Sequence, residues 1–241
     1  MIPYVESDLQ AVADKAVQIF FEQYELAVED RGQMIVGLSG GSTPKALYHA
    51  LRKHPLIQWE NIWFTFTDER FVPVNHPESN EGLAREHLFR PLHISDRKII
   101  SLIRANDPYE SADEAESVLQ RLFGSEPLLD LALLGLGDDG HTASLFPGEP
   151  GVHVHDRDII VTRAPVNAPI RISMTPRILN RARRTVFMVS GASKRKALWR
   201  CLRGPANFDE TPSQAVARYA WRPEVIADVA AAEDVTWDNF P

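Results

Sequence analysis

The 241-residue chain has a single cysteine, Cys201, and no long apolar run. One cysteine cannot form a disulfide within the chain or build a thiolate metal site alone, which agrees with a reducing compartment. No stretch approaches the roughly 20 apolar residues that a membrane helix needs, and the start of the sequence lacks the pattern of a secretory signal. We therefore expect a cytoplasmic protein without a membrane partner, in which Cys201 is a buried, inert thiol on a helix.

The sequence also lacks an excess of positive charge. It has 26 Lys and Arg residues against 33 Asp and Glu, which gives a formal net charge of −7. Neutralising the phosphates of a nucleic acid needs a basic face, so we expect no nucleic-acid partner. A small anionic ligand can still be bound where a few cations converge. The length and the 44% hydrophobic fraction fit one globular domain over residues 1–241.

Short apolar segments alternate with segments of helical periodicity. The segments typical of strands are 33–38, 61–67, 98–102, 128–136 and 184–190. Those typical of helices run from Ser7 to Gly32 and over 42–53, 79–90, 108–123 and 192–203. Ser7 and Gln10 have the spacing of a capping box for the first helix.

This alternation predicts an α/β fold of Rossmann-like type, with a mostly parallel sheet and helices on both faces. Residues 159–161 and 170–173 are expected to add short strands. The segment from Trp221 onward mixes strand and helix signals and fits neither pattern alone. We see no linker that would divide the chain into two domains.

A glycine-containing segment, SGGSTP (39–44), follows the first of these strands and opens a helix. Glycine allows positive φ and a close approach of the backbone to a ligand, and a helix N-terminus offers unpaired N–H groups and a positive dipole end. The candidates for binding a phosphate are therefore Ser39, Gly40, Gly41, Ser42 and Thr43. An ordinary tight turn with Ser42 or Thr43 as N-cap is the alternative. The spacings of a P-loop and of GxGxxG are both absent.

Charged residues follow the next strand in TDERFVP (67–73). The carboxyl ends of parallel strands are where such sheets bind ligands, so Asp68 and Arg70 are candidate site residues. Arg70 could pair with an anion or polarise a carbonyl, and Asp68 could hold Arg70 or a sugar hydroxyl. A surface ion-pair cluster at the strand end would give the same pattern.

The segment LLGLGDDGHTASLFP (133–147) brings one histidine to the end of a buried strand. Its glycines allow a sharp turn, and Asp138 or Asp139 could orient the His141 ring through one ring nitrogen. A neutral imidazole can take a proton from water near pH 7, so His141 is a candidate general base. A purely structural histidine is the alternative. No second histidine stands at the spacing of a metal site, and we expect no metal ion.

Two further cations stand near expected strands. Arg171 lies in RIS (171–173), and Lys194 lies in GASKRK (191–196), after a strand and near the start of a helix. With the amides of SGGSTP they could complete a phosphate clamp. In contrast, Arg181, Arg183 and Arg184 are expected to form a solvated face.

Five segments resemble one known family in their order and spacing. They are SGGSTPKALY, TDERFVP with SNEG nearby, LLGLGDDGHTASLFP, APIRISMTPRILN and GASKRKAL. Together they resemble the 6-phosphogluconolactonase family over residues 33–203. Each segment alone is modestly specific, whereas five in one order are strongly so. The segment at 221–240 resembles the family's ending only loosely.

The resemblance implies an enzyme that hydrolyses 6-phospho-D-glucono-1,5-lactone to 6-phosphogluconate in the pentose phosphate pathway, without a cofactor. It implies that His141 is the base for an attacking water and that Asp68 and Arg70 line the lactone site. Residues 39–43 with Arg171 and Lys194 would hold the phosphate. We count Asp139 with His141, Asp68 and Arg70 as catalytic candidates. The expected partner is the lactone alone, bound by a monomer or small homo-oligomer.

Two other functions stay open at this point. The glucosamine-6-phosphate deaminase/isomerase group has a similar histidine segment, with a glutamate five residues after the histidine where this sequence has Phe146. A phenylalanine cannot titrate, so the lactonase is favoured. The other function is a non-catalytic sugar-phosphate sensor. Such a protein would normally carry a DNA-binding helix pair, and the residues before Gln33 hold one expected helix.

Overall fold

The main sheet of the computed structural model, which describes residues 1–165 and 168–237, has six parallel strands. Their order is β1-β9-β8-β5-β2-β3. The strands are β1 (Ile2–Glu6), β2 (Met34–Leu38), β3 (Ile62–Phe66), β5 (Leu131–Leu134), β8 (Thr185–Val189) and β9 (Pro223–Asp228). β2, β5 and β8 are buried at every position, as expected of strands covered on both faces.

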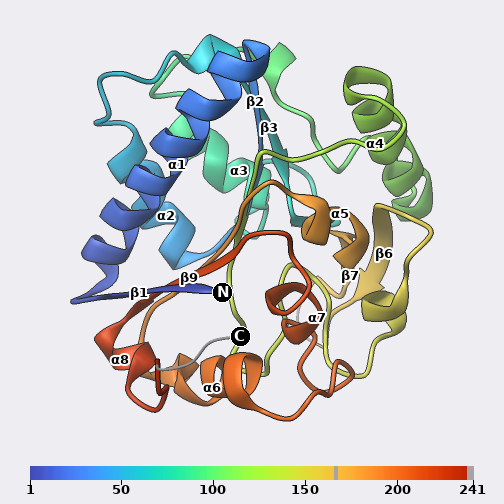
Figure 1. The fold of residues 1–241 in the computed structure, drawn as a ribbon. Helices are drawn as coiled ribbons and strands as arrows, with labels where there is room; N and C mark the ends of the chain where they lie inside the picture. Colours follow the sequence, from blue (N-terminus) through green and yellow to red (C-terminus); the bar gives the residue numbers. More distant parts are fainter. Residues whose placement is uncertain (166–167, 238–241) are drawn as a thin grey trace.

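Helices cover both faces of this sheet. Figure 1 shows α1 and α2 together on one side, in blue, and α4, α5 and α7 on the other. The helices are α1 (Leu9–Arg31), α2 (Ser42–Leu51), α3 (Asn80–Ala84), α4 (Pro108–Phe123), α5 (Pro176–Arg181), α6 (Arg195–Arg203), α7 (Gln214–Ala217) and α8 (Val229–Ala232). Shorter turns are η1 (Trp59–Asn61), η2 (Arg85–Phe89, π-helical), η3 (Asp96–Lys98), η4 (Pro150–His153) and η5 (Ala192–Lys194). The α/β fold predicted from the sequence is confirmed.

A second, antiparallel sheet of three strands adjoins the first. Its order is β4 (Asp68–Arg70), β7 (Ile170–Met174) and β6 (Ile159–Arg163), which confirms the short strands expected near 159 and 170. Thr67 joins the two sheets, because its N–H donates to Leu38 O and its carbonyl accepts from Met174 N, both at 2.8 Å. The chain therefore passes from β3 in the main sheet to β4 in the small sheet within one residue.

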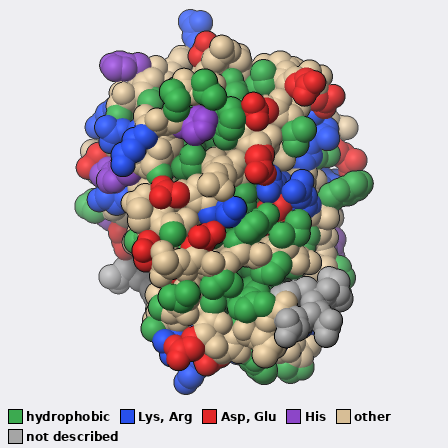
Figure 2. Space-filling model, turned by 60° about the vertical axis from the view of Figure 1, so that its left-hand side comes forward, with side chains coloured by type: hydrophobic (Ala, Val, Ile, Leu, Met, Phe, Trp, Pro, Cys, Tyr) green, Lys and Arg blue, Asp and Glu red, His purple; other side chains and the backbone are tan. Residues whose placement is uncertain are grey.

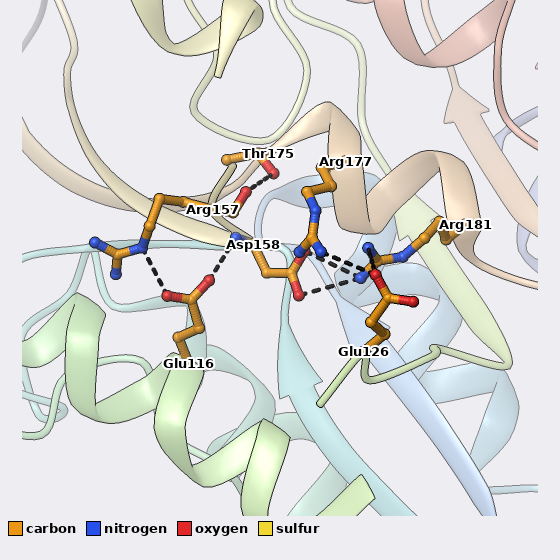
Figure 3. A network of polar contacts seen from close by, with 7 residues as sticks. All are labelled: Glu116, Glu126, Arg157, Asp158, Thr175, Arg177 and Arg181. Carbon is orange, nitrogen blue, oxygen red and sulfur yellow. Dashed lines mark hydrogen bonds and ion pairs between the residues drawn. The ribbon is translucent and has the colours of Figure 1, made fainter. Parts of the chain in front are cut away.

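A polar network holds the small sheet against α4 and α5 (Figure 3). Asp158, which is fully buried, accepts from Arg177 Nη1 at 2.6 Å and from Arg181 Nη2 at 3.1 Å. Glu116 of α4 accepts from Arg157 Nε at 2.7 Å and from the Asp158 N–H. Buried charges are stable only when paired, and here each carboxylate has at least two donors.

Two local expectations about secondary structure are wrong. The N-cap of α1 is Asp8, which accepts from Ala11 N at 2.9 Å, and Ser7 donates to Asp8 instead of capping the helix with Gln10. Residues 98–102 do not form a strand: Lys98 ends η3, and Ile99 makes only an isolated bridge to Phe64. This segment is apolar because Ile99, Ile100 and Leu102 pack into the core.

Arg184 is a further correction, because it is buried in the sheet instead of lying on a solvated face. Its guanidinium donates to Glu224 at 2.6 and 2.9 Å and to Glu22 at 2.9 Å. Glu224 belongs to β9 and Glu22 to α1, so Arg184 joins three elements distant in sequence. The arginines at 181, 183 and 184 look alike in the sequence, which does not reveal that Arg184 pairs with a buried carboxylate on β9.

Cys201 is buried in α6 as expected, and burial raises the pKa of its thiol to about 11. On the face shown in Figure 2, acidic and basic side chains are interspersed, with hydrophobic side chains between them. Across the part of the chain that the structure describes, no helix is both long and apolar enough to cross a membrane.

Replacing Arg184 with alanine should destabilise the protein by about 3–5 kcal/mol, because it leaves the buried Glu224 with only Arg222 as a cationic partner. Urea unfolding followed by circular dichroism measures this loss. Arg121→Ala, an exposed arginine on α4, is the control and should change the free energy of unfolding by no more than about 0.5 kcal/mol. A loss below about 1 kcal/mol for Arg184→Ala would contradict the assigned role.

Candidate active site

Four loops of the fold meet at one edge of the main sheet. β3, β2, β5 and β8 are neighbours and run parallel, so their carboxyl ends share that edge. The segments that follow these strands, in the same order, include 67–73, 39–44, 135–147 and 191–196. A pocket of about 290 Å³ opens between these loops. The predicted site residues that line it are Ser39, Gly40, Gly41, Asp68, Arg70, His141 and Lys194.

His141 is held at the pocket wall by a tight turn. Gly140 has a φ of +99°, and its N–H donates to Gly137 O at 3.0 Å. A Cβ at Gly137 would lie 2.1 Å from His141 Nδ1 and 2.5 Å from Asp139 Oδ1. Only glycine therefore allows the imidazole and the carboxylate to lie together at this point. The ring also contacts Phe146, with a centroid separation of 4.4 Å.

Asp139, not Asp138, is the carboxylate that orients His141. Its Oδ1 lies 2.6 Å from His141 Nδ1 and accepts from the His141 N–H at 3.0 Å. Burial opposes ionisation of Asp139, but these hydrogen bonds outweigh it and lower its pKa to about 2. Because a carboxylate can only accept, Nδ1 carries the ring proton in the neutral imidazole, and Nε2 is the nitrogen free to bind a proton.

Asp68 and Arg70 are fixed by the residues around them. Ser144 Oγ donates to Asp68 Oδ2 at 2.6 Å, and Asn80 Nδ2 donates to Asp68 O at 2.8 Å. Arg70 Nη1 donates to Asn80 Oδ1 at 2.8 Å and to Glu78 O at 2.6 Å. The side chains of this part of the site are thus hydrogen-bonded to one another before any ligand enters.

The SGGSTP loop presents backbone to the pocket. The Ser39 hydroxyl lies 2.6 Å from Leu133 O, so it ties β2 to β5. Gly41 has a φ of +106° and precedes the first residue of α2. The first helical hydrogen bond of α2 runs from Lys45 N to Gly41 O at 3.2 Å. Ser42 and Thr43 come before Lys45, so their N–H groups lie ahead of the first helical hydrogen bond. Neither residue is among those that line the pocket.

The two predicted cations occupy different positions. Lys194 lines the pocket, and its Nζ lies 2.6 Å from Asp138 Oδ1. Arg171 lies in β7 directly opposite Arg70 in β4 and is almost fully buried. Burial and the charge of Arg70 lower its pKa. Arg171 therefore lies beside Arg70 on the same face of the small sheet and is not among the residues that line the pocket.

The sequence does not predict the roles of two residues, one lining the pocket and one beside it. Asn80 lines the pocket and bonds to both Asp68 and Arg70, and SNEG at 79–82 had no assigned role. Glu69, which lies between the predicted residues Asp68 and Arg70 in the sequence, is the other. Within residues 1–165 and 168–237, no group of three or more His, Cys, Asp or Glu side chains is placed to hold a metal ion.

A family model described as glucosamine-6-phosphate isomerases/6-phosphogluconolactonase matches residues 7–224. The chain belongs to this family. Among its relatives, a 6-phosphogluconolactonase of Synechocystis sp. is 39% identical over 212 residues, which cover 86% of this chain and 87% of that protein. One of Bos taurus is 32% identical over 209 residues, covering 82% and 80%.

Solved structures of the family have the same fold. A 6-phosphogluconolactonase from Trypanosoma cruzi gives a TM-score of 0.87 at 27% identity, over 98% of this chain and 97% of that chain. A monomeric glucosamine-6-phosphate deaminase gives 0.80 at 20% identity, over 97% and 99%, which shows the shared fold alone. The family resemblance inferred from the five sequence segments is confirmed.

In this family member, Gly137→Ala should push the imidazole of His141 away from Asp139, because the added methyl overlaps both groups. ¹⁵N NMR of the imidazoles, with His141 assigned by comparison with His141→Asn, should show an Nδ1-protonated ring in the wild type and loss of that preference in the variant. Gly135→Ala is the matched control, since a Cβ there meets no atom within 4 Å. The same tautomer in both variants would argue against the steric role of Gly137.

Proposed function

We propose that the protein hydrolyses 6-phospho-D-glucono-1,5-lactone to 6-phosphogluconate. The observation that carries the proposal is His141, which is oriented by Asp139 and lines the same pocket as two cations, Arg70 and Lys194. The names of the relatives support it. A lactone is an activated ester, so a positioned water, a base and stabilisation of the oxyanion are enough for its hydrolysis.

In the proposed mechanism, His141 is the general base. Its Nδ1 donates to Asp139, and its Nε2 takes a proton from water as the water oxygen attacks the lactone carbonyl carbon. Arg70 or the glycine-loop amides stabilise the oxyanion that forms. When the bond from the carbonyl carbon to the ring oxygen breaks, Nε2 returns the proton to that oxygen. The products are the carboxylic acid and a free hydroxyl group.

The phosphate of the substrate would bind at the other end of the pocket. Lys194 supplies a point charge, and the backbone of residues 40–43 supplies N–H groups at the start of α2. Arg171, buried beside Arg70 on the neighbouring strand, would add positive charge near the phosphate without lining the pocket. Asp68 would hold a sugar hydroxyl while Ser144 keeps the carboxylate in place.

The alternative functions are less well supported. The deaminase group has a glutamate five residues after the histidine to assist ring opening, and in this chain that position is Phe146, whose ring packs on His141. A sensor would bind the sugar phosphate without turnover, so the first assay of the wild type separates it from the lactonase. Action as a single domain, as a monomer or small homo-oligomer, and in the cytoplasm without a nucleic-acid partner stay predictions from the sequence.

Replacing His141 with asparagine should lower kcat by about 100-fold to 10,000-fold, the usual loss when a general base is removed. Acid release from fresh 6-phosphogluconolactone, corrected for spontaneous opening, measures this effect, and calorimetry should show unchanged binding of 6-phosphogluconate. His153→Asn is the matched control, because His153 also pairs with a carboxylate, Asp209 at 2.7 Å, outside the pocket. Wild-type turnover in His141→Asn would reject the proposed base.

Removal of Lys194 should affect binding of the phosphate and leave the chemical step unchanged. For Lys194→Ala we expect KM for the phosphorylated lactone to rise about tenfold to 100-fold, with little effect on unphosphorylated gluconolactone. Lys196→Ala removes an exposed charge two residues away and should leave both substrates unaffected. Equal losses on both substrates would place the phosphate elsewhere.

A further inference from the structure

One buried carboxylate beside the pocket has no part in the mechanism above. Glu69 lies between Asp68 and Arg70 in β4 and is 2% exposed. Successive side chains of a strand point to opposite faces. Asp68 and Arg70 line the pocket, so Glu69 points away from it, toward the start of α3.

The Glu69 carboxylate accepts four hydrogen bonds. Its Oε1 accepts from the N–H groups of Arg70 at 2.8 Å and Asn80 at 2.7 Å. Its Oε2 accepts from Ser79 Oγ at 3.0 Å and Glu81 N at 2.8 Å. A carboxylate has just about four acceptor positions, so the group is saturated. Burial raises the pKa of Glu69 to about 7 against these four donors, and above that pH all four bonds are made to the charged form.

Asn80 connects Glu69 to the residues that line the pocket. Its backbone is held by Glu69, while its side chain donates to Asp68 O and accepts from Arg70 Nη1, both at 2.8 Å. It also lies against the SGGSTP loop, since a Cβ at Gly40 would be 1.8 Å from Asn80 Oδ1. One amide therefore contacts the loops that follow β2 and β3.

We propose that Glu69 is a positioning residue of the site: three of its four hydrogen bonds hold residues 79–81, and Asn80 sets the orientation of Asp68 and Arg70. The inference rests on the proposed lactonase function for its kinetic consequence. Its structural consequence is independent of that function: Arg70 loses its fixed orientation when Glu69 or Asn80 is changed.

The test is a double-mutant cycle of Glu69→Gln and Asn80→Ala at pH 7.5. The amide of Glu69→Gln has the same shape but one acceptor oxygen instead of two, so its NH₂ group must face part of the donors and the hold on residues 79–81 weakens. Each single variant should lower kcat/KM for the phosphorylated lactone by up to about 100-fold, as displaced groups do. The double variant should be no worse than the worse single one, because both changes break the same connection.

Glu81→Gln is the matched control. Glu81 is on the same helix, and its side chain pairs with Arg85 at 2.8 Å, outside the pocket. It should keep kcat/KM within about twofold of the wild type. Losses that add in the double variant, or normal kinetics in Asn80→Ala, would overturn the proposal.

A second readout needs no substrate. In ¹⁵N relaxation, the Arg70 Nε–H signal should be rigid in the wild type and in Glu81→Gln and mobile in Glu69→Gln and Asn80→Ala. A rigid Arg70 in both site variants would overturn the positioning role. If Glu69→Gln does not fold, Asn80→Ala decides by the same two measurements. Absence of lactonase turnover in the wild type would refute the proposed function and leave the NMR test of Arg70 intact.

Discussion

The structure depends on one constraint, the common direction of the six strands in the main sheet. Parallel strands need long crossover connections, so each strand is separated from the next by a helix or a long loop. All the carboxyl ends then lie at the same edge, and the order β8-β5-β2-β3 places four of the following loops side by side. The loop of His141 follows β5 and lies between the loops of Lys194 and Gly40. Residues from four distant parts of the chain thus meet in one pocket.

Carboxylates brace three parts of this pocket from outside. Asp139 accepts from the backbone and ring of His141, and Glu69 accepts from the backbone of Asn80. Asp228 plays the same part for the GASKRK loop, where it accepts from Gly191 N at 2.9 Å and from Ser190 Oγ. A carboxylate has several lone pairs and no donor, so it suits the unpaired N–H groups of tight turns.

The sequence predicted best what short-range spacing encodes. The turn from Gly137 to His141 contains its own glycines and acids, so the candidate base could be found from one segment. The sequence does not predict β1 and leaves the segment of β9 undecided, because the pairing of these strands joins the two ends of the chain and local periodicity does not report it. Residues 98–102 are apolar enough for a strand, but their side chains are buried in the core from a loop just as well. Arg184 and Asn80 owe their roles to partners distant in sequence or in another loop, and residue type alone does not reveal such partners.

Lys194 at the pocket has a carboxylate partner of its own, since its Nζ lies 2.6 Å from Asp138 Oδ1. An anion that bound this ammonium group would share its three N–H donors with Asp138, so it would gain less than at an unpaired lysine. A doubly charged phosphate would be attracted to the ammonium group more strongly than a singly charged carboxylate of equal size. Under the proposed function, Asp138 would therefore favour strongly charged anions over weakly charged ones at Lys194.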